Sequence, residues 1–252
     1  MTRFFIPSSQ IEGNRVFLRG ADRHHLLTVL REGPGAEIMV LNGRGEEFQA
    51  KITAISPDAV EAEICRRSER VVEPRLRINL AQSLPKADKF EWIIQKNTEV
   101  GVARFQPVLS ERSNIRLDRD TTAKKMERWR RIIQEAAEQS GRAVLPELEP
   151  IRSWDRFLEE LRPGLILIPW EGEQTRSLRE ILSRKQPADG AAAWPGEVTV
   201  IIGPEGGFSL DEVAEAQSRG AIPVTLGPRI LRTETAGLVV AAALLYHFDD
   251  LG

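Results

Sequence analysis

From Arg75 to the C-terminus, short apolar runs alternate with segments of helical periodicity, and this alternation strongly constrains the fold of the 252-residue chain. The runs are almost continuously apolar, as in strands that are buried on both faces. Buried strands joined by helices form a mostly parallel sheet with helices on each side, so we expect an α/β domain. The expected strands are RINLAQS (77–83), FQPVLS (105–110), LILIP (165–169), VTVIIG (198–203) and IPVTL (222–226). The expected helices cover about 88–101, 121–140, 175–184, 209–219 and 234–248.

The N-terminal part of the chain has a different pattern, typical of short strands and turns. Between Val60 and Cys65 apolar and polar residues alternate strictly, which predicts a half-buried strand. The turn residues NGRG (42–45) separate two apolar runs and predict a β-hairpin, and HHLLTVLR (24–31) predicts a short helix. We therefore expect a small β-barrel over residues 1–72 and a second domain over residues 73–252.

Composition and residue usage exclude several classes of protein. No apolar run reaches the roughly 18 to 20 residues of a membrane helix, and MTRFFIPSSQ at the start lacks the features of an export signal. The single Cys65 excludes an internal disulfide and any site built from several cysteines. His24 and His25 would diverge by about 100° on a helix, so they do not form a metal pair. We expect a cytoplasmic protein with no metal and no membrane partner.

The net charge of −2 conceals an uneven distribution of charged residues. Residues 1–72 carry ten basic and ten acidic side chains, whereas residues 75–145 carry fifteen basic against nine acidic ones. Residues 146–252 carry ten basic against seventeen acidic side chains, and their Pro-, Gly- and Ala-rich segment 184–197 predicts an exposed insertion. A basic middle segment fits a face that binds phosphates and fits a solvated helix surface equally well.

Two glycine-containing loops follow expected strands in the second domain. The first is IIGPEGGFSLDE, which follows the strand VTVIIG and precedes a helix. We expect Gly203, Gly206 and Gly207 to adopt positive φ and to let the backbone approach a ligand closely. Ser209, with Glu212 three residues later, predicts a capping box at the start of the helix.

The second loop, TLGPRILRTETAGL (225–238), follows the strand IPVTL, and Thr233 is a candidate cap of the last helix. Neither loop matches a dinucleotide-binding or P-loop motif. Both lie at the carboxyl ends of strands, where open α/β sheets bind ligands. One such loop is explained by a tight turn without a ligand, but two in consecutive units favour a pocket. Small residues that permit close packing of the last helix are Ala236, Gly237, Ala241, Ala242 and Ala243.

Five motifs, in this order along the chain, resemble those of the RsmE family of methyltransferases. They are LPKADKFEWIIQKNTEVGV (84–102), ERS (111–113), EQSGR (138–142), GPEGG (203–207) and LGPRILRTETA (226–236). In the N-terminal part, RFF near the start and HHLLTVLR resemble the PUA-like RNA-binding barrel of that family. The resemblance spans nearly the whole chain.

The resemblance implies a SPOUT α/β domain with a C-terminal trefoil knot and a PUA-like N-terminal barrel. It also implies methylation of N3 of a uridine in bacterial 16S ribosomal RNA, in the free RNA or in the assembled 30S subunit. The implied methyl donor is S-adenosylmethionine, a sulfonium cation that needs no metal for activation, and the implied assembly is a homodimer. The residues that the resemblance assigns to the cofactor are Ile202, Gly203, Gly207, Leu226, Gly227, Ile230, Leu231, Arg232, Thr235 and Ala236.

Methylation at N3 requires removal of a proton and stabilisation of an anionic ring. Arg232 is the candidate that binds the anionic base or a neighbouring phosphate. Glu234 and Glu205 are candidate proton acceptors or counterions of the sulfonium, and each is explained equally by stabilisation of a helix N-terminus. The candidate RNA contacts are His24, Arg31, Lys86, Lys96, Arg112, Gln139 and Arg142.

Two other functions remain open at this point. One is a SPOUT methyltransferase that acts on transfer RNA or on a ribose 2′-hydroxyl. The other is an RNA-binding dimer without catalytic activity.

Overall fold

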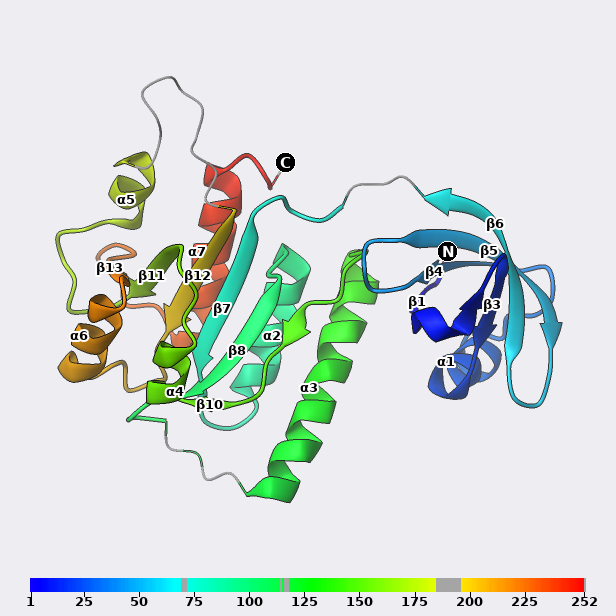
Figure 1. Ribbon diagram of the computed structural model, residues 1–252, viewed down its shortest axis with the longest axis horizontal. Helices are drawn as coiled ribbons and strands as arrows, with labels where there is room; N and C mark the ends of the chain where they lie inside the picture. The colour runs from blue at the N-terminus through cyan, green and yellow to red at the C-terminus, as the bar shows by residue number, and fades with distance from the viewer. Residues whose placement is uncertain (69–71, 114, 116–117, 185–195, 252) are drawn as a thin grey trace. The chain divides into compact units, whose positions relative to one another are not determined.

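The computed structural model describes residues 1–68, 72–113, 115, 118–184 and 196–251, and Figure 1 follows their course. They group into two compact units, which we call the N-terminal unit (Met1–Glu73 with Gln134–Leu145) and the C-terminal unit (Pro74–Ile133 with Pro146–Gly252). The domain division expected at residues 72 and 73 stays a prediction. The structure differs from it in assigning the segment Gln134–Leu145 to the N-terminal unit.

Apolar packing explains why this segment belongs to the N-terminal unit. Ala137 and Ala143 are buried in one cluster with Phe5 and Leu41. The backbone N–H of Leu145 also donates to the carbonyl of Gly43 at 3.2 Å, in the turn of the expected hairpin. The strand pattern of the N-terminal residues does not predict that the distant segment Gln134–Leu145 packs against them.

A six-stranded mixed sheet forms the N-terminal unit, in the order β1-β4-β5-β6-β3-β2. Strand β1 pairs parallel with β4, and the other pairs are antiparallel. Register shifts between β5 and β6 bend these long strands, so the sheet curves into a half-barrel (Figure 1). The strands are β1 (Arg3–Phe5), β2 (Ile11–Glu12), β3 (Arg15–Leu18), β4 (Glu37–Leu41), β5 (Glu47–Ile55) and β6 (Val60–Ser68).

The local expectations for this unit hold with one correction. The hairpin at NGRG joins β4 to β5, and the alternating segment lies in β6. The short helix begins earlier than expected: α1 (Gly20–His24) continues as a π-helical turn, His25–Val29, and a 3-10 turn covers Ser8–Gln10. Leu26 on the π-helical turn is fully buried in the core of the unit, which explains why the turn packs there.

A seven-stranded sheet, parallel throughout, forms the centre of the C-terminal unit. Its order is β10-β8-β7-β12-β11-β13, with β9 also paired to β8. The expected parallel sheet is therefore confirmed. The strands are β7 (Arg77–Ser83), β8 (Arg104–Leu109), β9 (Glu147–Leu148), β10 (Arg152–Ser153), β11 (Leu165–Pro169), β12 (Glu197–Ile202) and β13 (Ile222–Val224).

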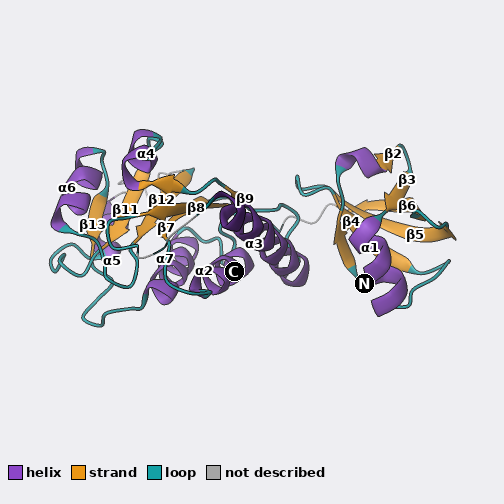
Figure 2. Cartoon of the chain, turned by 90° about the horizontal axis from the view of Figure 1, so that it is seen from below, coloured by secondary structure: helices purple, strands orange, loops and turns teal. Residues whose placement is uncertain are grey.

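Helices cover both faces of this sheet, as Figure 2 shows from below. Helices α2 and α7 lie on one face, where Leu80 and Val200 of the strands are buried among their apolar side chains. Helices α4 and α6 lie on the other face, over Ala81 and Ile201, the next residues of the same strands. The helices are α2 (Lys89–Val100), α3 (Arg119–Ser140), α4 (Trp154–Glu159), α5 (Leu178–Arg184), α6 (Leu210–Ser218) and α7 (Thr233–His247).

Close packing of the last helix agrees with its small residues. A Cβ placed on Gly237 of α7 would lie 3.1 Å from a methyl carbon of Leu80, so the helix backbone lies against β7. Helix α4 and the two-residue strands β9 and β10 were not expected, since elements this short carry little periodicity. The expected insertion at 184–197 falls largely on residues 185–195, outside the described residues.

Candidate active site

The loop after β12 makes a tight turn at the carboxyl edge of the sheet. The N–H of Gly207 donates to the carbonyl of Pro204 at 3.0 Å, and Gly207 has a φ of +67°. Gly203 and Gly206 do not have positive φ, which corrects the expectation for these two glycines. Packing makes Gly203 special instead, because a Cβ there would lie 3.3 Å from the ring of Phe208.

The capping box expected at the start of α6 is present and reaches a second loop. The hydroxyl of Ser209 accepts from the N–H of Glu212 at 3.3 Å, and the Glu212 carboxylate accepts from the N–H of Ser209 at 3.0 Å. The same carboxylate accepts from the N–H of Glu111 at 2.7 Å. Arg112 donates to the carbonyl of Gly206 at 2.7 Å, so the ERS motif fastens the glycine loop.

The loop after β13 presents an open, partly apolar surface. Gly227 has a φ of +107°, and no atom lies within 4 Å of a Cβ built on it. The hydroxyl of Thr225 accepts from the N–H of Gly227 at 3.2 Å and fixes the start of the loop. Ile230 is 87% exposed and lines the cavities described below, so its apolar side chain is accessible to a ligand there.

A buried polar cross-link joins the two glycine loops to β7. Gln82 is fully buried, and its amide donates to the Thr233 hydroxyl at 2.9 Å and to the Gly203 carbonyl at 3.4 Å. The Thr233 hydroxyl donates to the same carbonyl at 2.5 Å. Thr233 is thus not the helix cap: Arg232 occupies the N-cap position of α7, without a side-chain cap. The amide oxygen of Gln82 is buried and has no hydrogen-bond partner among the described residues.

A third loop, which follows β11, also lies at the carboxyl edge of the sheet. Sequence reasoning did not identify it as part of the site. Glu173 accepts from the Thr175 hydroxyl at 2.7 Å and from the N–H groups of Thr175 and Arg176, and these bonds lower the pKa of Glu173 to about 2. Trp170 and Glu171 precede it in the same loop. The apolar run LILIP followed by WEGE could have indicated this loop, because a third parallel strand also ends at the carboxyl edge, where ligands bind.

Two adjoining cavities lie between these three loops. One has a volume of about 600 Å³ and lies between the β11 and β13 loops, and the other has about 500 Å³ and lies over the β12 loop. Their volumes are in the range of small-molecule sites. Nine of the ten residues assigned to the cofactor line them, and Thr235 lines a third, more open cavity beside α2. The nine are Ile202, Gly203, Gly207, Leu226, Gly227, Ile230, Leu231, Arg232 and Ala236.

Charged side chains gather where the second and third cavities meet. Lys89 binds Glu205 at 2.9 Å and lies 3.8 Å from Glu234, and Arg232 lies 3.9 Å from Glu234. Burial would raise the pKa of Glu205, but the hydrogen bonds from Lys89 and from the N–H of Lys86 hold it below its ordinary value. One carboxylate oxygen of Glu234 is buried and has no hydrogen-bond partner among the described residues.

These two carboxylates differ in the hydrogen bonds that they accept. Glu205 is held in its charged form by donors, which makes it a weak base. Glu234 accepts no hydrogen bond among the described residues, and its buried oxygen lies 3.8 Å from the ammonium of Lys89. Sequence reasoning placed both residues at the site but did not identify Lys89, which lies between them.

The candidate RNA contacts are divided between the two units. In the C-terminal unit Lys86 is exposed, while Lys96 pairs with Glu99 at 2.8 Å and Arg112 binds the glycine loop. In the N-terminal unit His24, Arg31 and Gln139 are exposed.

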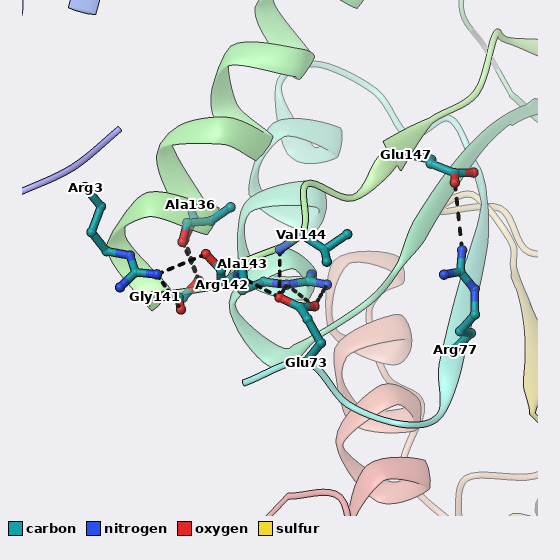
Figure 3. A network of polar contacts seen from close by, with 11 residues as sticks. Arg3, Glu73, Arg77, Ala136, Gly141, Arg142, Ala143, Val144 and Glu147 are labelled. Carbon is teal, nitrogen blue, oxygen red and sulfur yellow. Dashed lines mark hydrogen bonds and ion pairs between the residues drawn. The ribbon is translucent and has the colours of Figure 1, made fainter. Parts of the chain in front are cut away.

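Arg142, unlike the other candidates, is buried. Its guanidinium pairs with Glu73 at 2.6 Å, as Figure 3 shows. The Glu73 carboxylate also accepts from the N–H groups of Ala143 and Val144 at 2.8 and 3.0 Å. Only 5% of Arg142 is exposed, so the structure gives it a role in holding the segment after α3 and leaves little of it for RNA.

The described residues offer neither a metal-binding cluster nor a membrane-spanning helix. They contain no group of three or more His, Cys, Asp or Glu side chains placed to bind a metal ion. They also contain no helix with the length and apolarity needed to cross a membrane.

Comparisons with known proteins agree with the geometry of this site. Residues 72–245 match the family model of the RNA methyltransferase domain, and residues 18–65 match that of the RNA methyltransferase PUA domain. Ribosomal RNA small subunit methyltransferase E of Bacillus subtilis (strain 168) is 33% identical over 255 residues, which cover 100% of this chain and 98% of the relative.

The corresponding protein of Synechocystis is 34% identical over 96% of this chain and 76% of the relative. A crystal structure of ribosomal RNA small subunit methyltransferase E from Neisseria gonorrhoeae, bound to S-adenosyl methionine, is 36% identical with a TM-score of 0.83 and covers 97% of each chain. The motifs, the two-unit fold and these matches agree, and the chain belongs to the ribosomal RNA small subunit methyltransferase E family.

Proposed function

We propose that this protein methylates N3 of one uridine in bacterial 16S ribosomal RNA, with S-adenosylmethionine as the methyl donor. The observation that carries the proposal is the pair of adjoining cavities at the carboxyl edge of the sheet, which open onto the charged cluster of Lys89, Glu205, Arg232 and Glu234. Relatives of about one-third identity are named for methylation of small-subunit ribosomal RNA.

The residues present fit S-adenosylmethionine. Apolar side chains of Leu226, Ile230 and Leu231 suit the adenine ring, and the open space at Gly227 leaves room for a ligand against the backbone. The bound cofactor supplies an electrophilic methyl group.

The chain's own residues then prepare the uracil for attack. Arg232, whose side chain is 85% exposed at the edge of the second cavity, binds the anionic ring or a phosphate next to it. Glu234 accepts the N3 proton, because it lines the second cavity and its carboxylate accepts no hydrogen bond among the described residues, while Lys89 and Arg232 lie 3.8 and 3.9 Å away. Lys89 and Glu205 form an ion pair that holds the β12 loop against the start of α2.

We also propose three further properties of the protein. The last helix passes through a trefoil knot, the protein acts in the cytoplasm, and it acts as a homodimer. Exposed apolar side chains of Trp92 on α2 and of Val239 and Tyr246 on α7 support the dimer. Val239 and Tyr246 are seven residues apart and so share one face of α7. His24, Arg31, Lys86 and Gln139 are proposed to bind RNA.

Mass spectrometry of ribosomal RNA tests the proposal. A strain that lacks the gene should lose one methyluridine from 16S RNA, and the purified protein should restore it with labelled S-adenosylmethionine. Parallel reactions with deproteinised 16S RNA and with 30S subunits identify the form that is the substrate. A methyl group lost from transfer RNA or from a ribose hydroxyl would contradict the assignment. Normal RNA in the deletion strain, with no methyl transfer in vitro, would leave only an RNA-binding role.

A further inference from the structure

Glu171 lies at the junction of the two cavities over the glycine loops. It lines both of them, together with Pro169, Ile230, Leu231 and Ala236. Among the residues that the structure describes, no hydrogen bond or ion pair involves its carboxylate, in contrast to Glu173 two residues later. The junction thus contains a negative charge that the fold itself does not use.

The surrounding chain leaves room for this carboxylate against the β12 loop. Gly207 faces it directly: a Cβ on Gly207 would overlap with a carboxylate oxygen of Glu171. A Cβ on Gly172 would overlap with the ring of Trp170, so the next position also requires glycine. The bonds of Glu173 to Thr175 and Arg176 fix the following turn. Gly207 therefore leaves the space that the Glu171 carboxylate occupies over the β12 loop, and the bonds of Glu173 shape the turn that follows.

A free carboxylate inside a ligand site favours a positive charge on the ligand. S-adenosylmethionine carries such a charge on its sulfur, whereas S-adenosylhomocysteine, the product of methyl transfer, is a neutral thioether. The adenine walls lie in the first cavity and the reactive cluster lies in the second, so the sulfur has to lie near the junction.

We propose that Glu171 pairs with the sulfonium and makes the site selective for the methyl donor over its demethylated product. This inference rests on the proposed function. Selectivity of this kind favours release of the product, because transfer of the methyl group removes the charge that Glu171 attracts. The ribose hydroxyls and the amino-acid part of the cofactor are common to donor and product, so contacts with them do not distinguish the two.

Calorimetry of the purified protein with each molecule tests the proposal. We expect Glu171→Gln to weaken binding of S-adenosylmethionine about fivefold to tenfold and binding of S-adenosylhomocysteine less than about twofold. Glu171→Asp keeps the charge and should retain most of the selectivity. Asp211→Asn, at an exposed carboxylate on α6 away from the cavities, removes the same charge and should leave both affinities unchanged.

Three results would overturn the proposal. Equal weakening of both ligands by Glu171→Gln would indicate that the carboxylate binds a neutral part common to both, such as the ribose. Unchanged affinities in Glu171→Gln would show that Glu171 does not contact the cofactor. If Asp211→Asn weakened binding as much as Glu171→Gln does, the effect would come from the net charge of the protein. Absence of binding by the wild-type protein would instead contradict the proposed function, so the two failures are distinguishable.

Discussion

Arg232 precedes helix α7 at the edge of the second cavity, and the one ion pair of its side chain among the described residues is the long pair with Glu234 at 3.9 Å. A surface arginine in this position contributes roughly 0.5 kcal/mol or less to stability. A group that binds the anionic uracil contributes about 2 to 4 kcal/mol to the transition state. We therefore expect Arg232→Ala to slow methylation roughly 30- to 1,000-fold without changing the melting temperature, measured by single-turnover methyl transfer.

Arg232→Lys separates charge from geometry in the same assay. A single phosphate contact should survive this change in part, whereas bidentate recognition of the base should not. Affinity for S-adenosylmethionine should stay within about twofold in both variants if Arg232 acts on RNA. Methylation at the wild-type rate by Arg232→Ala would remove the residue from the mechanism.

Gly203 and Gly227 should both be intolerant of valine, for different reasons. Gly227 has a left-handed backbone that a β-branched residue resists, and its missing Cβ faces open space where the ligand would lie. Gly203 has an ordinary φ, but its missing Cβ faces Phe208 at 3.3 Å. We expect both substitutions to abolish binding of S-adenosylmethionine in calorimetry.

Stability distinguishes the two variants. Gly203→Val should also lower the melting temperature through the clash with Phe208, whereas Gly203→Ala should be milder. Gly227→Ala should lose part of the affinity, since the backbone strain remains although the side chain is small. Normal cofactor binding by both folded valine variants would show that the pocket lies elsewhere.

Helix α1 is the element for which the structure predicts a pH dependence. Burial, together with repulsion from Glu138, raises the pKa of Asp22 from 3.8 to about 6, although His25 opposes the shift. The folded state therefore binds a proton more tightly than the unfolded state does. The stabilising contribution of Asp22 is complete below pH 3.8 and is lost as the pH rises through about 6.

Asp22→Asn removes this penalty at neutral pH. We expect it to raise the free energy of unfolding by about 1 kcal/mol near pH 7.5, after allowance for screening by water, and to change it little near pH 4. Urea denaturation at both pH values measures the difference. Asp58→Asn, at an exposed carboxylate of the same unit, is the control. An equal effect of Asp22→Asn at both pH values would contradict the titration argument.

At the scale of the whole molecule, the exposed apolar side chains of α2 and α7 predict self-association. Tyr246 is 77% exposed and Val239 is 39% exposed on the same face of α7. We expect light scattering to show a dimer at micromolar concentration and Tyr246→Glu to shift it toward the monomer, because a charge would be buried in the interface. Arg219→Glu, after α6 on the other face of the sheet, should leave the dimer intact. A fully active wild-type monomer would contradict the proposed assembly.

Several features of this protein follow from its sequence alone. The alternation of apolar runs with helical periods determined the parallel sheet, because buried strands leave little freedom in where helices pack. Two of those strands match their expected bounds, β7 and β11. The capping box at Ser209 is equally local, since all of its atoms come from four consecutive residues. The glycine loops were found because glycine marks close approaches of the backbone.

Only the tertiary structure decided which distant residues share the site. The bonds of Gln82 to the glycine loops and the position of Glu171 in the pocket depend on the order in which β7, β12 and β11 lie side by side, and local periodicity does not encode that order. The burial of Arg142 against Glu73 depends in the same way on the return of α3 to the N-terminal unit. Local patterns report the conformation of neighbouring residues, whereas ion pairs and cavities arise from contacts between residues far apart in the chain.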